Sequence, residues 1–288
     1  MNPSTVFLSR VSYPLSALIT INLRMTLLRR KILFPAIVAL IPLFPVLFWR
    51  LIVAIYGFPP SKSGGDPFNI YTLCSASMFM QFVVPLLSLL RGLSVMSEEV
   101  DEGTLIFLRL RPIPRTVIVL GKFMAYVLSV VILTGISLTA VYLILGSMPG
   151  ADMILSEYRV LLRDMRIFAL GLASYGAVMM LVGIFFKHSL KVGAFLLFVW
   201  DAFAAYIPGT AHKLTIKHYL QSIFPRQDFA SGGGNDVKEI MIALLSEHKP
   251  SSATVSIVTL LGIIAASIVL TVLALKYKEF KGGQQETG

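Results

Sequence analysis

The sequence has few charged residues for a chain of 288 residues. Asp, Glu, Lys and Arg make up 14% of it, against about 25% in ordinary soluble domains. Apolar residues reach 56% and occur in runs of about twenty, the length of a membrane-spanning helix. These features exclude a soluble globular domain and a disordered chain, and they predict an all-α integral membrane protein.

Cysteine and enzyme motifs are also scarce. Cys74 is the one cysteine, so no intrachain disulfide, Cys-ligated zinc site or Cys-based redox pair can form. The sequence contains no G-x-x-x-x-G-K-[ST] phosphate loop, no H-E-x-x-H and no G-x-S-x-G. His212 and His218 share a loop with Asp228 and Asp236, and we interpret both histidines as solvated rather than metal-binding. We therefore expect no catalytic residue, no metal ligand and no cofactor in this chain.

Six apolar runs are long enough to cross a hydrocarbon layer of about 30 Å. They cover residues 32–56, 73–96, 117–146, 165–186, 190–208 and 253–275. Pro35, Pro42, Pro45 and Pro85 fall inside the first two runs and predict kinks that neighbouring helices help to satisfy. The run 117–146 is so long that it must tilt, kink or project beyond the bilayer.

The remaining segments are expected to lie at or beyond the membrane surfaces. Residues 1–31 form an N-terminal segment with an amphipathic interfacial helix, ahead of a six-span domain at 32–280, and residues 281–288 form a tail. Between the last two spans lies a helical outer insertion, 209–252. Apolar stripes over 154–165 and 237–245 predict short helices that rest on the outer surface and cover the bundle.

The positive charges predict the orientation. The net charge is +10, but the cations lie at the ends of apolar runs rather than in one stripe, which argues against nucleic acid. With a cytoplasmic N-terminus, the inside segments hold 14 of the 25 Lys and Arg residues (five, four, two and three in chain order), and the short outer loops hold 4. The positive-inside bias therefore places both termini in the cytoplasm.

Three ionisable residues fall inside the predicted spans. Arg50 and Arg91 lie near span ends, where their long stems can reach the headgroups, and we interpret them as anchors. Asp201 lies about ten residues beyond Lys191, hence about 15 Å deep. Such a short carboxylate should face the bundle, a cavity, or a cation such as Arg91 or Arg50. A structural ion pair and a role in transport both remain open.

The loop after the second span, 97–116, combines acids, apolar residues and bases. It reads S-E-E-V-D-E-G-T-L-I-F-L-R-L-R-P-I-P-R-T. Apolar side chains rimmed by charges on a cytoplasmic surface are typical of a docking surface for another protein.

From Glu98 to Lys122 the sequence follows E-x-x-x-E-G-T-L-x-x-L-x-x-x-P-I-x-R-x-x-I-x-x-G-K, which resembles the signature of type-2 ATP-binding-cassette transporter permeases. In that family this loop carries a coupling helix that touches the ATPase subunit. The resemblance assigns ATPase coupling to Glu98, Glu99, Asp101, Glu102, Gly103, Thr104, Leu105, Leu108, Pro112, Arg115, Gly121 and Lys122. One departure is Ile113-Pro114, where the family usually has a small residue before the arginine.

The resemblance implies the membrane-spanning permease subunit of an ATP-driven transporter, an exporter, in a prokaryotic cytoplasmic (inner) membrane. It also implies a homodimer or a pairing with a paralogous permease, in the lipid bilayer, on nucleotide-binding ATPase subunits that bind ATP and Mg. Two other functions stay open: an integral membrane enzyme acting on lipid, and a membrane anchor that recruits a cytosolic ATPase.

Overall fold

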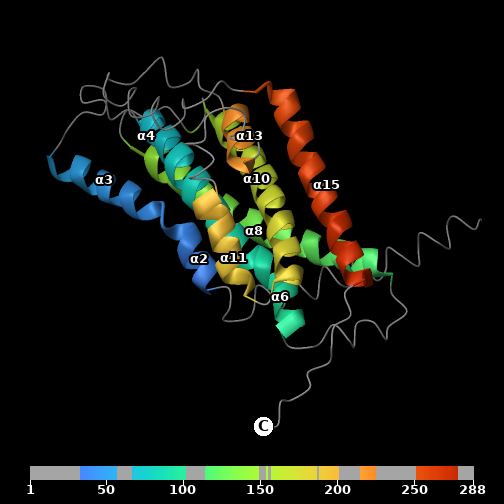
Figure 1. Cartoon of the computed structure of the whole chain (residues 1–288). Coiled ribbons are helices and arrows are strands. Elements are labelled where there is room, and N and C mark those ends of the chain that lie inside the picture. Colours follow the sequence, from blue (N-terminus) through green and yellow to red (C-terminus); the bar gives the residue numbers. More distant parts are fainter. Residues whose placement is uncertain are drawn as a thin grey trace, which may run out of the picture.

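The computed structural model describes residues 33–56, 67–101, 114–148, 154, 157–186, 188–200, 215–224 and 251–277, and the structural statements below concern these residues (Figure 1). All regular elements in this part of the chain are helices. They are α2 (Leu33–Leu40), α3 (Leu43–Tyr56), α4 (Pro67–Cys74), η2 (Ser75–Val83), α5 (Val84–Leu87), η3 (Ser88–Gly92), α6 (Leu93–Asp101), α8 (Arg115–Gly146), α10 (Tyr158–Phe185), α11 (Ser189–Ala194), η4 (Phe195–Trp200), α13 (Ile216–Ile223) and α15 (Ala253–Tyr277), where η denotes a π-helix.

Five helical stretches are long and apolar enough to cross a membrane. They are Leu33–Ile55, Pro67–Ser97, Thr116–Gly146, Tyr158–Phe185 and Ala253–Leu275. The prediction of an all-α integral membrane protein is therefore confirmed. Of the predicted fifth span, the described part is the shorter apolar helix Ser189–Val199, while 201–208 lies outside the described residues. The crossing of the membrane by the predicted fifth span, the total of six spans and the cytoplasmic termini stay predictions.

A proline divides the first span as predicted, whereas the second span remains continuous. The chain turns at Ile41–Pro42 between α2 and α3, because proline offers no N–H to continue a helix. The second span stays helical past Pro85, but it alternates between α-helix and the wider π-helix of η2 and η3. π-Helical turns inside α-helices are often found at functional sites.

The structure corrects the prediction of a separate surface helix over 154–165. Residues 158–165 are the first two turns of α10, which continues without a break to Phe185. The second predicted surface helix, 237–245, and the amphipathic helix within 1–31 lie outside the described residues.

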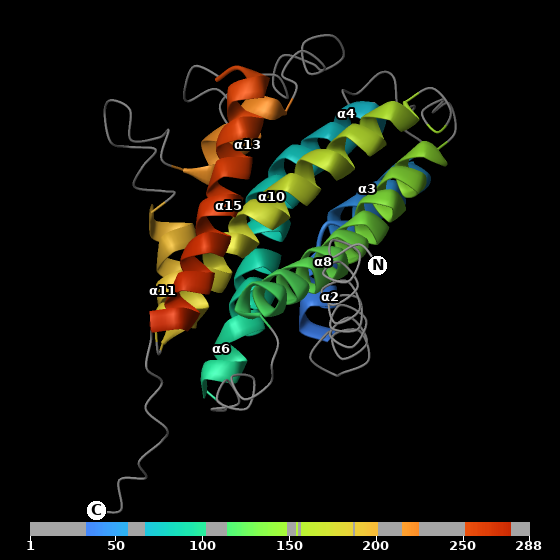
Figure 2. The same ribbon diagram turned by 90° about the vertical axis from the view of Figure 1, so that its right-hand side faces the viewer.

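The helices run up and down between two ends of one bundle. We call these ends the α6 end, where α6 and α15 finish and α2 begins, and the α4 end, where α4, α10 and α15 begin (Figure 2). The long helix α8 crosses obliquely between them (Figure 2).

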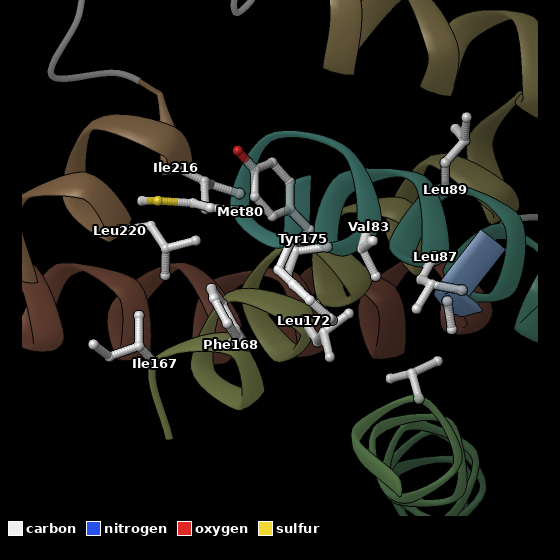
Figure 3. Packing of buried hydrophobic residues seen from close by; sticks show 14 of the residues in the cluster. Met80, Val83, Leu87, Leu89, Ile167, Phe168, Leu172, Tyr175, Ile216 and Leu220 are labelled. Atoms are coloured by element: carbon white, nitrogen blue, oxygen red, sulfur yellow. The ribbon is translucent and has the colours of Figure 1, made fainter. Parts of the chain in front are cut away.

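Helix α10 is the centre of the bundle. In its most apolar window 72% of residues are buried, against 22% in the first and last spans. Phe168 of α10 stacks on Phe79 at 5.8 Å and on Phe224 at 6.3 Å between ring centroids. Figure 3 shows Phe168 and Leu172 of α10 among side chains of η2 and α13. The helices that flank α10 are therefore fixed mainly by their contacts with it.

Candidate functional site

The predicted coupling loop connects two helices that meet at the α6 end. Glu98, Glu99 and Asp101 lie in the last turns of α6, and Arg115 is the first residue of α8. The other loop residues that the sequence assigns to coupling lie outside the described residues: Glu102, Gly103, Thr104, Leu105, Leu108 and Pro112. The structure thus fixes where the loop leaves the bundle and where it returns.

Pro114 determines where α8 begins. Its backbone is extended, with φ −58° and ψ 134°, and its carbonyl accepts hydrogen bonds from Val117 N at 3.0 Å and Ile118 N at 3.3 Å. A proline loses no helical hydrogen bond at the start of a helix, because the first N–H groups have no partner there. The proline in the Ile113-Pro114 departure therefore serves as the N-cap of α8.

Lys122 connects α8 to α6. It is buried with an exposed fraction of 8%, and its Nζ donates to Val95 O at 3.4 Å. The neighbouring Gly121 is buried as well. Val95 is the third residue of α6, so the Lys122 ammonium lies against the first turn of that helix. Lys122, the last residue of the signature, thus contacts α6, the helix that contains Glu98, the first residue of the signature.

Glycines bring the helix before the loop into backbone contact with α10. A Cβ at Gly183 of α10 would lie 2.9 Å from Leu93 O, and one at Gly92 would lie 2.9 Å from Met179 Cβ and 3.2 Å from Gly176 O. Small residues at such crossings let membrane helices pack closely. Because no side chain separates these backbones, a displacement of α6 must also displace α10.

Tyr126 of α8 contacts two other helices, η3 through Ser88 and α10 through Leu172. It is 4% exposed, its Oη donates to Leu172 O at 2.9 Å, and the same oxygen lies 3.2 Å from Ser88 Oγ. Its ring packs directly on Gly176, so that a Cβ there would overlap the ring. Sequence reasoning missed Tyr126, because a tyrosine inside an apolar run carries no sign of the partners that the fold gives it.

The two span arginines contact the protein itself. Arg50 Nη1 donates to Ser147 Oγ at 3.0 Å and to Ile144 O at 3.4 Å, so its cation lies at the carbonyl end of α8. Arg91 lies close enough to the Tyr126 hydroxyl for an electrostatic interaction. The Arg50 contact joins two helices, and the anchoring of Arg50 and Arg91 at the headgroups stays a prediction. Asp201 lies outside the described residues, so its predicted pairing stays a prediction.

Two polar residues are more buried than their sequence neighbours suggest. Asp164 is completely buried, and its Oδ1 lies 3.2 Å from Arg163 Nε. His218, expected to be solvated, is 7% exposed on α13, with its Nε2 3.1 Å from Ser251 Oγ. In both cases tertiary packing encloses a residue whose sequence neighbours are polar. His212 lies outside the described residues.

The comparison with known families covers roughly the first two thirds of the chain. Residues 24–201 match the family model described as ABC-2 family transporter protein. The chain belongs to this family. The matched region extends from the start of the first span to the end of η4 and includes α6, α8 and α10. No curated protein matches the chain.

Membership of the ABC-2 family defines the general role of the chain. It is a multi-pass membrane subunit of an ABC transporter, it is not itself a catalytic enzyme, and it works with an ATP-binding subunit. Within this subunit, Lys122 joins α8 to α6, and Gly92 and Gly183 hold the second span against the central helix α10.

Proposed function

We propose that the chain is the permease subunit of an exporter in a prokaryotic cytoplasmic membrane, and that it works as a homodimer or with a paralogous permease. A separate ATPase subunit binds ATP and Mg, and its closure moves residues 98–115. Both termini and this loop are cytoplasmic, as the distribution of Lys and Arg predicts.

The observation that carries the proposal is the continuous contact from the loop to the central helix. Lys122 joins α8 to α6, Gly92 and Gly183 hold the second span against α10, and Tyr126 joins α8 to α10. A force applied at the loop therefore reaches the centre of the bundle through packed backbone. ATP can drive this movement only if it binds one state of the assembly more tightly than the other.

Paired substitutions in the loop test the coupling. Changing Leu105 and Leu108 together to Asp should leave the amount of membrane-inserted permease unchanged, because both residues lie outside every span. The variant should no longer copurify with the ATPase, or should retain it without stimulated hydrolysis, since a buried charge without a partner disfavours the interface. Changing Ser61 and Ser63 to Asp adds the same charge in the predicted outer loop 57–72 and should have no effect.

Two results would contradict the proposal. One is a Leu105→Asp/Leu108→Asp permease that binds its ATPase and transports at the parental rate. The other is cysteine labelling, on a background without Cys74, that reaches position 147 only from the cytoplasm. Inside-out vesicles test the direction, because an exporter should accumulate its substrate when ATP is added outside. Transport in vesicles also excludes a simple membrane anchor.

A further inference from the structure

Asp164 is a buried carboxylate that takes no part in the proposed coupling mechanism. It lies six residues into α10, about 9 Å from the start of the helix at 1.5 Å per residue, and its exposed fraction is 0%. An ionisable side chain enclosed in a membrane bundle is costly and usually faces a partner or a pathway. Asp164 thus has to be matched by a cation.

The cation beside Asp164 is the chain's own Arg163. Arg163 Nε lies 3.2 Å from Asp164 Oδ1, and the arginine side chain is 30% exposed while the aspartate is fully enclosed. Neighbouring residues of a helix do not face each other, so the arginine reaches sideways to the carboxylate. Arg163 is long enough to swing out to the surface, whereas the short Asp164 is fixed. The ion pair therefore has one displaceable member.

Tyr71 of α4 lies beside this ion pair, within electrostatic range of both Asp164 and Arg163. Its ring meets Tyr142 of α8 edge to face, at 5.4 Å between ring centroids and 81° between ring planes. Both tyrosines are buried. Aromatic faces and carboxylates together bind organic cations. Asp164 already binds one organic cation, the guanidinium of Arg163.

An apolar cavity lies one helical turn farther along the contact between α8 and α10. Its volume is about 80 Å³, and its lining includes Leu138 of α8 with Met165 and Phe168 of α10. Phe168 is four residues from Asp164 and Leu138 is four from Tyr142, so on each helix the cavity shares the face of the polar group. A cavity of about 150 Å³ holds benzene, so this one suits a short alkyl group.

We propose that Asp164, Tyr71 and Tyr142 bind the ammonium group of an amphiphilic cation whose alkyl part enters the adjacent cavity, and that Arg163 is a displaceable competitor for the same carboxylate. The proposal goes beyond the coupling mechanism, since binding at this site needs neither the ATPase nor the loop 98–115. An experiment that contradicts cation binding at Asp164 therefore does not contradict coupling through residues 98–115, and the reverse also holds.

Thermal unfolding of the purified full-length chain in an uncharged detergent tests the site. The probe is n-hexylammonium, with n-hexanol and hexanoate as uncharged and anionic controls of the same length. Only the ammonium should raise the midpoint of unfolding, by an amount that grows with the logarithm of its concentration above the Kd of the site. Ethylammonium should need a higher concentration, because it cannot fill the cavity.

The variants should have opposite effects. Asp164→Asn should abolish the ammonium-specific shift, whereas Arg163→Gln should lower several-fold the concentration of n-hexylammonium needed for a given shift, because it removes the competitor. Arg166→Gln is the matched control: this arginine is exposed on the same helix, with its Nε bonded to Leu162 O at 3.1 Å, and its loss should leave the response unchanged.

A purely structural ion pair gives a different result. Arg163→Gln would then weaken or leave unchanged the response to n-hexylammonium, and either outcome overturns the proposal. Equal shifts with n-hexanol and n-hexylammonium also overturn it. If Asp164→Asn does not yield folded protein, the direction of the Arg163→Gln effect and the n-hexanol control still decide.

Discussion

The contact between Gly176 and Tyr126 gives a strong test of the packing around α10. Gly176→Ala adds one methyl group to a helix interior, a change that ordinarily stabilises a helix by about 0.5–1 kcal/mol. At this position the new Cβ would overlap the Tyr126 ring. The ring is buried and its hydroxyl donates to Leu172 O, so it cannot withdraw without losing that bond.

The expected cost follows from these contacts. Forcing an extra methyl group into a packed interior costs about 1–3 kcal/mol, and displacement of the Tyr126 hydroxyl from Leu172 O adds about 1 kcal/mol. We expect Gly176→Ala to lower the free energy of unfolding by about 2–4 kcal/mol. The matched control is Gly262→Ala on α15, where a Cβ meets nothing within 4 Å; it should be neutral or slightly stabilising.

A double-mutant cycle in detergent identifies the cause. Unfolding is followed for Gly176→Ala, Tyr126→Leu and the double variant. Tyr126→Leu is itself destabilising, but in its presence the alanine at 176 should cost almost nothing, because the ring that it would overlap is gone. The interaction free energy should therefore nearly equal the cost of Gly176→Ala alone.

Two outcomes would refute this reasoning. If Gly176→Ala is as stable as Gly262→Ala, the helices are not in the contact described. If the two substitutions are simply additive, the cost of the alanine does not come from Tyr126.

Three further predictions concern other contacts. Gly183→Leu should prevent α6 from packing on α10 and abolish recovery of monodisperse permease, whereas Gly262→Leu, on the open face of α15, should not. Lys122→Gln should retain the ATPase in copurification but reduce stimulated hydrolysis, because it removes the cation that donates to Val95 O; unchanged stimulation would exclude Lys122 from coupling. Ser251→Ala removes the contact with His218 Nε2, worth about 1 kcal/mol, and should speed amide exchange of α13 about fivefold, whereas Ser256→Ala, whose hydroxyl bonds only within its own helix, should not.

Hydropathy located most of the spans closely. The predicted 117–146 and 253–275 correspond to Thr116–Gly146 and Ala253–Leu275. It failed at the α4 end, where the second and fourth spans begin earlier than predicted, at Pro67 and Tyr158. These early turns contain polar residues such as Asn69, which is 6% exposed. A hydropathy scale measures the polarity of a side chain, not whether the fold encloses it.

The error at the start of α10 has a specific physical cause. The apolar stripe at Tyr158 and Leu162 was interpreted as the face toward the protein, yet these side chains are 48% and 49% exposed. The buried face instead contains Val160, Asp164 and Phe168, which recur every four residues. In water an apolar stripe faces the core, but beside lipid an apolar side chain gains nothing by turning inward, and the polar group must be enclosed. The helical period places Asp164 on that buried face once the segment is taken as membrane-spanning. Sequence could therefore have found this carboxylate, whereas the roles of Tyr126 and Gly176 depend on a helix crossing that no local pattern specifies.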